Sequence, residues 1–124
     1  MIVAGIGCKT GIAAEAVVAL VLAAGEEGLG APDLLAVPEF RRDEEGIAEA
    51  AETLGIPILW IGRAALKGEQ GRCLTRSSRA ERAVGLASVA EAAALAGAGP
   101  GGRLVLARIA AEGVSCALAE GVVH

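Results

Sequence analysis

Segment 5–11 carries the residue types with the clearest potential for chemistry. Its glycines, Gly5, Gly7 and Gly11, surround Cys8 and Lys9. Glycine lets backbone amides approach a ligand, and a helix that begins directly after such a loop favours an anion at its N-terminus. The spacing differs from both the phosphate-binding P-loop and the dinucleotide fingerprint. The segment therefore has two open interpretations, an anion-binding loop and a structural turn.

Cys8 is a candidate reactive thiol. It precedes an expected helix start and stands beside Lys9, and both features lower a thiol pKa. A catalytic cysteine normally also needs a base, and the single histidine, His124, is the last residue of the chain. We therefore expect Cys8 to contact a ligand or pack in the loop, and we expect no histidine-based metal site. Cys116 lies in an apolar segment and is expected in the core.

Two carboxylates and one arginine are further candidates. Arg41 and Glu44 follow the second apolar segment, where they could face a ligand or serve as a surface cation and a capping carboxylate. Glu91 stands three residues after Ser88, which is the spacing of a helix capping box. Each residue therefore has a structural interpretation beside the functional one.

The elements that must position these residues alternate between strand and helix. Short apolar segments bounded by Gly and Pro predict strands, and longer Ala-rich segments with capping or acidic first-turn residues predict helices. The expected strands are 2–4, 34–37, 58–61, 104–107 and 114–118, and the expected helices are 12–27, 43–54 and two short ones that begin at the capping boxes near 78 and 88. Segment 67–78 is expected to be a loop, and Glu112 with Gly113 a hairpin turn. The pattern predicts a single α/β domain over 1–124, a three-layer α/β/α fold whose mostly parallel sheet carries a C-terminal antiparallel strand pair.

Composition argues against nucleic acid and membrane as partners. The chain of 124 residues is 54% hydrophobic with a net charge of −4, and its aromatic residues are Phe40 and Trp60. The negative charge and the lack of an aromatic and basic stripe argue against a nucleic-acid partner. The longest apolar run is broken by Glu15 and is too short for a membrane span. Three cysteines without a CxxC pair predict a reducing compartment, so we expect a cytoplasmic protein without a membrane partner. The Ala-rich helices leave homo-oligomer formation open.

Several motifs together resemble the CobE / CbiG C-terminal domain family of cobalamin biosynthesis. Segment 5–11 is similar to that family's opening Gly-Ile-Gly-Cys-Arg-Arg-Gly, and Glu44 and Gly46 stand where the family has its Glu-x-Gly. Segment 84–95 matches the family's Val-Gly-Val-x-x-Val-Ala-Glu-Ala-Ala-Ala-Leu almost residue for residue. The resemblance extends in the right order over nearly the whole chain.

The resemblance implies a set of ligand-binding residues. Lys9 replaces the usual Arg, whereas Arg41 and Arg108 replace the usual Lys, so positive charge is kept at each position. Ile12 and Ala13 replace the family's Thr-Ser, which removes two hydroxyl groups from the helix start. The implied binding residues are Gly5, Gly7, Cys8, Lys9, Thr10, Gly11, Arg41, Thr75, Ser77, Arg108 and Ser115.

The resemblance also implies a function on corrin-ring intermediates. Proteins of the CbiG type open the δ-lactone of cobalt-precorrin-5A and release a two-carbon fragment. This chain starts at Met1 without the domains that precede theirs, so it looks like the stand-alone CobE form. We expect it to bind a carboxylate-rich precorrin or corrinoid, which can carry cobalt, and to have no cofactor of its own. If the ligand is hydrolysed, Glu44 or Glu91 would be the general base, with Lys9 stabilising the oxyanion.

Two alternatives remain at this point. The first is a non-catalytic carrier that hands corrinoid intermediates to other enzymes of the cobalamin pathway. The second is a small nucleotide-binding α/β protein that uses the glycine segment 5–11 for phosphate. A ligand whose mass is unchanged after binding would favour the carrier, and a rise in melting temperature with nucleotide would favour the second alternative.

Overall fold

A five-stranded sheet organises the computed structural model, which describes residues 1–28, 30–75 and 88–121. The strand order is β3-β2-β1-β5-β4. The strands are β1 (Ile2–Cys8), β2 (Leu34–Pro38), β3 (Ile58–Ile61), β4 (Arg103–Ala111) and β5 (Val114–Glu120). β2 is parallel to β1 and β3, whereas β5 is antiparallel to β1 and β4. Because only β5 runs against the other strands, the mostly parallel sheet with an antiparallel C-terminal pair is confirmed.

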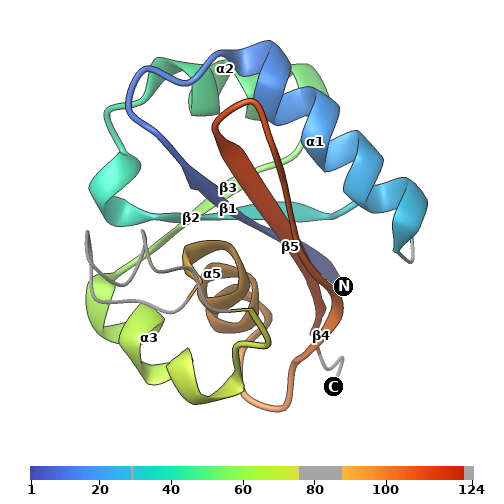
Figure 1. Ribbon diagram of the computed structural model, residues 1–124, viewed down its shortest axis with the longest axis vertical. Helices are drawn as coiled ribbons and strands as arrows, with labels where there is room; N and C mark the ends of the chain where they lie inside the picture. Colours follow the sequence, from blue (N-terminus) through green and yellow to red (C-terminus); the bar gives the residue numbers. More distant parts are fainter. Residues whose placement is uncertain (29, 76–87, 122–124) are drawn as a thin grey trace.

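Helices cover both faces of the sheet. Figure 1 shows α1 (Ala14–Glu27) and α2 (Glu45–Leu54) over one face, and α3 (Arg63–Gly68) and α5 (Val89–Ala98) over the other. Two 3₁₀ turns, η1 (Glu39–Arg41) and η2 (Gln70–Arg72), follow β2 and α3. The predicted three-layer α/β/α architecture is therefore confirmed. In the described residues, no helix has both the length and the hydrophobicity to cross a bilayer.

The two faces of the sheet pack residues of different size. Toward α1 and α2, alternate strand positions such as Ile6, Leu35 and Leu118 form a core of large aliphatic side chains. Toward α5 the β5 positions are small, and Ala117 and Ala119 pack against alanines of the helix. Small residues on both partners let α5 approach the sheet closely, which brings the helix start near the strand ends.

The glycines of β1 are part of this close packing. A Cβ atom at Gly5 would lie 2.0 Å from the carbonyl oxygen of Ala90 and 2.4 Å from the backbone nitrogen of Ala94. The prediction that segment 5–11 is entirely a loop is therefore wrong, because β1 continues to Cys8. The continuation depends on pairing with β5, which runs from Ile2 opposite Glu120 to Cys8 opposite Val114. This pairing joins residues more than a hundred positions apart, so local sequence does not reveal it.

The other local predictions have different outcomes. The loop expected over 67–78 is partly wrong, because α3 extends to Gly68, with the buried Leu66 packed into the core beside α5. The hairpin turn is confirmed, with φ angles of 54° at Glu112 and 81° at Gly113, as a tight turn with two positive φ values requires. The cap expected at Ser88 is also confirmed, whereas the capping box expected near 78 lies outside the described residues.

Candidate ligand-binding site

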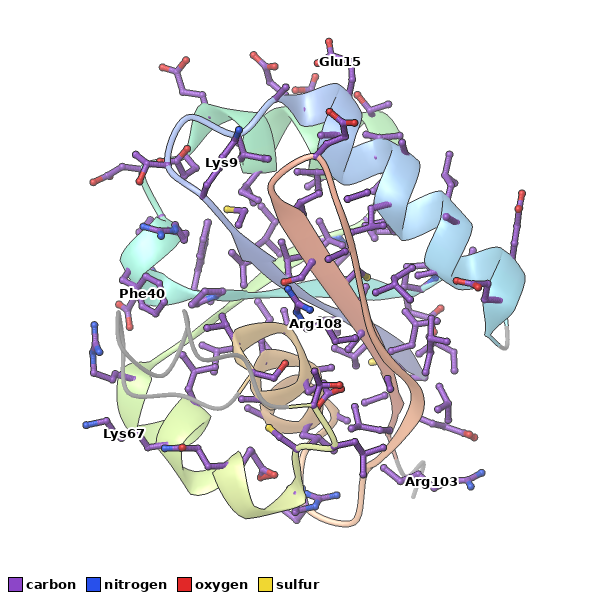
Figure 2. All side chains as sticks on the ribbon, in the orientation of Figure 1. Lys9, Glu15, Phe40, Lys67, Arg103 and Arg108 are labelled. Atoms are coloured by element: carbon purple, nitrogen blue, oxygen red, sulfur yellow. The ribbon has the colours of Figure 1, made fainter. Side chains whose placement is uncertain are left out.

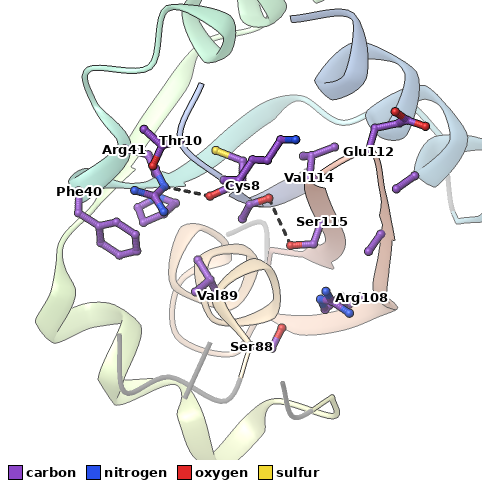
Figure 3. A pocket seen from close by; sticks show the side chains of 16 residues that line it. Cys8, Thr10, Phe40, Arg41, Ser88, Val89, Arg108, Glu112, Val114 and Ser115 are labelled. Carbon is purple, nitrogen blue, oxygen red and sulfur yellow. Dashed lines mark hydrogen bonds between the residues drawn. The ribbon is translucent and has the colours of Figure 1, made fainter. Parts of the chain in front are cut away.

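A cavity of about 590 Å³ opens at the edge of the sheet where β1 and β2 end. We call it the rim cavity. Its walls are the end of β1, η1, the tip of the β4–β5 hairpin and the start of α5 (Figure 3). This place agrees with the rule that ligands of open α/β sheets bind beyond the carboxyl ends of the strands. Its volume lies within the usual range for small-molecule sites.

Three cationic side chains from distant parts of the sequence line the rim cavity. Lys9 follows β1, Arg41 ends η1, and Arg108 lies on β4. Arg41 and Arg108 come from different walls of the cavity, with Cys8 between them in the view of Figure 3. In the described part of the chain, no carboxylate lies within salt-bridge distance of these cations. Their charges are therefore not neutralised by any described carboxylate.

Hydrogen bonds fix the backbone around Arg41 and Ser115. The Nε–H of Arg41 donates to the carbonyl oxygen of Cys8 at 2.9 Å, which ties η1 to the end of β1. The Ser115 hydroxyl donates to the carbonyl oxygen of Gly7 at 3.3 Å. The Arg41 side chain also forms a hydrogen bond with the Cys8 thiol. A guanidinium group has five N–H donors, so further donors remain for a ligand carboxylate.

An apolar surface lies between the cations. Phe40, Val89, Ala110 and Val114 line the rim cavity together with Pro38. The Phe40 ring is also covered by guanidinium groups, with Arg41 Cζ 5.2 Å and Arg63 Cζ 5.3 Å from its centroid. A ligand with an apolar body and carboxylate substituents would match this combination of surfaces.

The backbone amides of the glycine segment are partly engaged already. The Lys9 N–H donates to the carbonyl oxygen of Gly113 at 2.9 Å. The Gly11 N–H donates to Oε1 of Glu44 at 2.7 Å, and the Ile12 N–H to the same oxygen at 3.3 Å. The Lys9 and Gly11 amides expected to hold an anion thus have protein acceptors, which shifts anion binding toward the side chains.

The chemistry of Cys8 differs from the expectation. Burial raises the pKa of its thiol above the ordinary value, opposed by the charge of Arg41, while the Glu44 carboxylate raises it further. The expected lowering by Lys9 and a helix N-terminus is wrong. Cys8 ends a strand six residues before α1 begins, so burial of the thiol is the larger effect. A thiol with a raised pKa is neutral near pH 7 and a poor nucleophile.

Glu44 and Glu91 lie outside the rim cavity and both accept backbone N–H groups. Glu44 holds the segment before α1, and the close contact between Gly46 and Ile12 locks the same junction. Glu91 is fully buried and, among the described residues, accepts the backbone N–H groups of Leu74, Thr75 and Arg108. Neither carboxylate lines the cavity, so a role for either as a base stays a prediction without a supporting contact.

The structure brings most of the predicted binding residues to one place. The rim cavity is lined by Gly7, Cys8, Lys9, Thr10, Arg41, Arg108 and Ser115. Gly5 is buried beneath α5, Gly11 faces Glu44, the Thr75 N–H binds Glu91, and Ser77 lies outside the described residues.

Sequence reasoning missed several residues of the cavity wall. Phe40 is one, although an aromatic residue directly after a strand end was a usable signal. Val89, Glu112 and Gly113 are others, and only the pairing of β5 with β1 brings the hairpin tip to this edge. The segment from Gly62, which follows the third strand, does not contribute to the cavity wall as far as residue 75. Within the described residues, no cluster of three or more His, Cys, Asp or Glu could hold a metal ion.

Comparisons with known proteins agree with the resemblance. The sequence profile of the family described as "Cobalamin synthesis G C-terminus" matches residues 2–119. Protein CobE of a Sinorhizobium species is 33% identical over an alignment of 121 residues, and the match covers 95% of this chain and 79% of that protein.

Solved structures show the same fold. A crystal structure of CobE, a protein from the cobalamin biosynthetic pathway, is 35% identical and superposes with a TM-score of 0.91, covering 100% of this chain and 92% of the other. The cobalamin biosynthesis protein chiG from Agrobacterium tumefaciens is 38% identical, with a TM-score of 0.81 and coverage of 99% and 100%. The chain therefore belongs to the cobalamin synthesis G C-terminus family and is a protein of cobalamin biosynthesis.

Proposed function

We propose that this protein binds a carboxylate-rich corrinoid intermediate in the rim cavity and hands it on chemically unchanged. The observation that carries the proposal is the presence of three cations without carboxylate partners among the described residues, Lys9, Arg41 and Arg108, around one apolar hollow. Corrin precursors have a broad apolar ring with acetate and propionate groups at its rim. Guanidinium groups pair with such carboxylates in two-pronged hydrogen bonds.

Carriage has more support here than hydrolysis. The carboxylates proposed as bases, Glu44 and Glu91, already accept backbone hydrogen bonds, and neither lines the rim cavity. The thiol of Cys8 does line it, but burial raises its pKa and keeps it protonated near pH 7. The chain's own residues therefore supply binding and orientation, while the cobalt of a metallated ligand would arrive as part of the cargo. The other enzymes of the pathway are the expected donors and acceptors of that cargo.

The nucleotide-binding alternative has weaker support. A pyrophosphate would need free amides in the glycine segment, and two of these, at Lys9 and Gly11, donate to Gly113 and Glu44. Gly7 serves packing instead, because a Cβ atom there would meet the Ser115 hydroxyl at 2.7 Å.

Replacement of Arg108 by alanine tests the proposal. The R108A protein should bind cobyrinic acid, a cobalt corrin with free carboxylates, about fivefold more weakly, since one ion pair at a partly exposed site is worth roughly 1 kcal/mol. R103A is the matched control, because Arg103 lies at the other end of β4 and pairs with Glu120 at 3.4 Å. Equal affinity of R108A and wild-type protein would place the ligand elsewhere.

A further inference from the structure

Glu91 is a buried carboxylate with an unusual set of partners. Its side chain is 0% exposed, and Oε1 accepts the N–H groups of Leu74 at 2.7 Å and Thr75 at 2.8 Å. Oε2 accepts the N–H of Arg108 at 2.9 Å. Burying a carboxylate without such donors would be strongly unfavourable, and these bonds from described residues satisfy its oxygens.

The carboxylate stands in the first turn of α5. Ser88 caps this helix by accepting the Glu91 N–H at 3.3 Å, and Ser88 also lines the rim cavity. Glu91 thereby joins the start of α5 to two other segments, residues 74–75 and strand β4. A negative charge in the first turn is also favoured by the helix dipole.

The bond to Arg108 falls at an irregularity of β4. Leu106 lies opposite Leu118, and the next matched pair is Ile109 with Cys116. Between these two pairs β4 advances by three residues and β5 by two, which is the extra residue of a β-bulge. A bulge takes a residue out of the ladder and changes the direction of its side chain. Arg108 lies within this irregular stretch, and its N–H is bonded by Glu91.

We propose that Glu91 is a positioning residue for ligand binding. By accepting the Arg108 N–H, its carboxylate holds the irregular stretch of β4 in the form that presents the Arg108 guanidinium to the rim cavity. The inference rests on the proposed function for its ligand, and it assigns Glu91 a role without proton transfer. Figure 3 shows Arg108 and Ser88, the cap of α5, among the side chains that line the rim cavity.

A double-mutant cycle tests the coupling. The glutamine side chain in E91Q must turn an N–H₂ group toward one of the three backbone N–H donors, so at least one bond is lost. We expect E91Q and R108A each to weaken binding of cobyrinic acid about fivefold. The E91Q/R108A protein should bind no more weakly than R108A alone, because the displaced guanidinium is already absent. If the affinity losses of E91Q and R108A instead multiply in the double variant, Glu91 acts independently of Arg108, and the proposal is overturned.

E44Q is the matched control. Glu44 is also a carboxylate that accepts backbone N–H groups, but those groups belong to Gly11 and Ile12 just before α1. Any effect of E44Q on affinity should therefore multiply with that of R108A. If E91Q does not fold, E91D takes its place in the cycle, since it keeps the charge and shortens the side chain by one methylene. An independent effect of E91D in the R108A background would overturn the proposal in the same way.

Amide hydrogen exchange tests the structural step without any ligand. The Arg108 amide should exchange at least about tenfold faster in E91Q, while the Lys9 amide, bonded to Gly113, should be unchanged. Unchanged exchange at Arg108 would overturn the inference whether or not a corrinoid binds. Faster exchange at Arg108 in E91Q, combined with a wild-type protein that binds no corrinoid, would instead overturn the proposed function and with it the role of Glu91 in ligand binding.

Discussion

Burial sets the chemistry of the cysteine side chains. Cys8 borders the rim cavity, whereas Cys116 lies on β5 in the core below α1 and α2. Burial raises the pKa of the Cys116 thiol to about 12, and it also raises that of Cys8. Both thiols are thus neutral in the folded protein near pH 7, although they lie in different surroundings.

The Cys116 thiol should make the folded state sensitive to alkali. Its pKa is about 12 when folded, against 9.0 for the ordinary value, so the unfolded chain releases this proton first. Stability from the neutral thiol is complete below the ordinary pKa and is lost as the pH rises toward the folded value, by at most about 1.4 kcal/mol per pH unit. Urea unfolding at about pH 8 and about pH 10.5 should show a smaller alkaline loss for C116A than for wild-type protein. Equal losses in both proteins would contradict the assignment.

Residues of the site differ in how far sequence could reveal them. Lys9 and Arg41 follow strand ends, a position that predicts a site by itself. Arg108 and Ser115 were identified only through the family resemblance, because pairing between β5 and β1 brings them to the cavity. The partners of Glu91 could not be predicted either, since the irregularity in β4 leaves no local signature.

At the scale of elements, the close contact between α5 and β1 depends on Gly5, because a glycine has no side chain to keep the helix away. Sequence predicted β3 with its bounds and the α5 cap, because Pro, Gly and capping residues mark them locally. The sequence did not predict the full length of β1. Its glycines suggest a loop, because the packing of α5 that requires them is not visible in the sequence. It missed α3 because this helix is short and has no side-chain cap.

Replacement of Gly5 by alanine should therefore be severely destabilising. The new methyl group would meet backbone atoms of α5 at 2.0 and 2.4 Å, which forces the helix away from the sheet. We expect a loss of about 3 kcal/mol or more in the free energy of unfolding, measured by urea denaturation. G68A is the matched control, because nothing lies within 4 Å of a Cβ atom there. A loss below about 1 kcal/mol in G5A would contradict the close packing.

At the scale of the whole molecule, charge is unevenly distributed. The net charge is −4, yet the rim cavity carries Lys9, Arg41 and Arg108. A second hollow beside the start of α1 is instead lined by four carboxylates, those of Glu15, Glu44, Glu45 and Glu49. Figure 2 shows Glu15 and Arg108 well apart on the molecule. A carboxylate-rich ligand would be repelled from the acidic hollow and attracted to the rim cavity.

Binding of a carboxylate-rich corrinoid in the rim cavity can be measured directly. Purified protein would be titrated with cobyrinic acid and with its metal-free counterpart, followed by visible absorbance, and the mass of the recovered ligand would be measured by mass spectrometry. We predict a saturable spectral change that weakens with added salt, is much smaller for the fully methyl-esterified ligand, and leaves the ligand mass unchanged. No saturable change with either carboxylate ligand would contradict corrinoid binding, and an altered ligand mass would contradict carriage without chemistry.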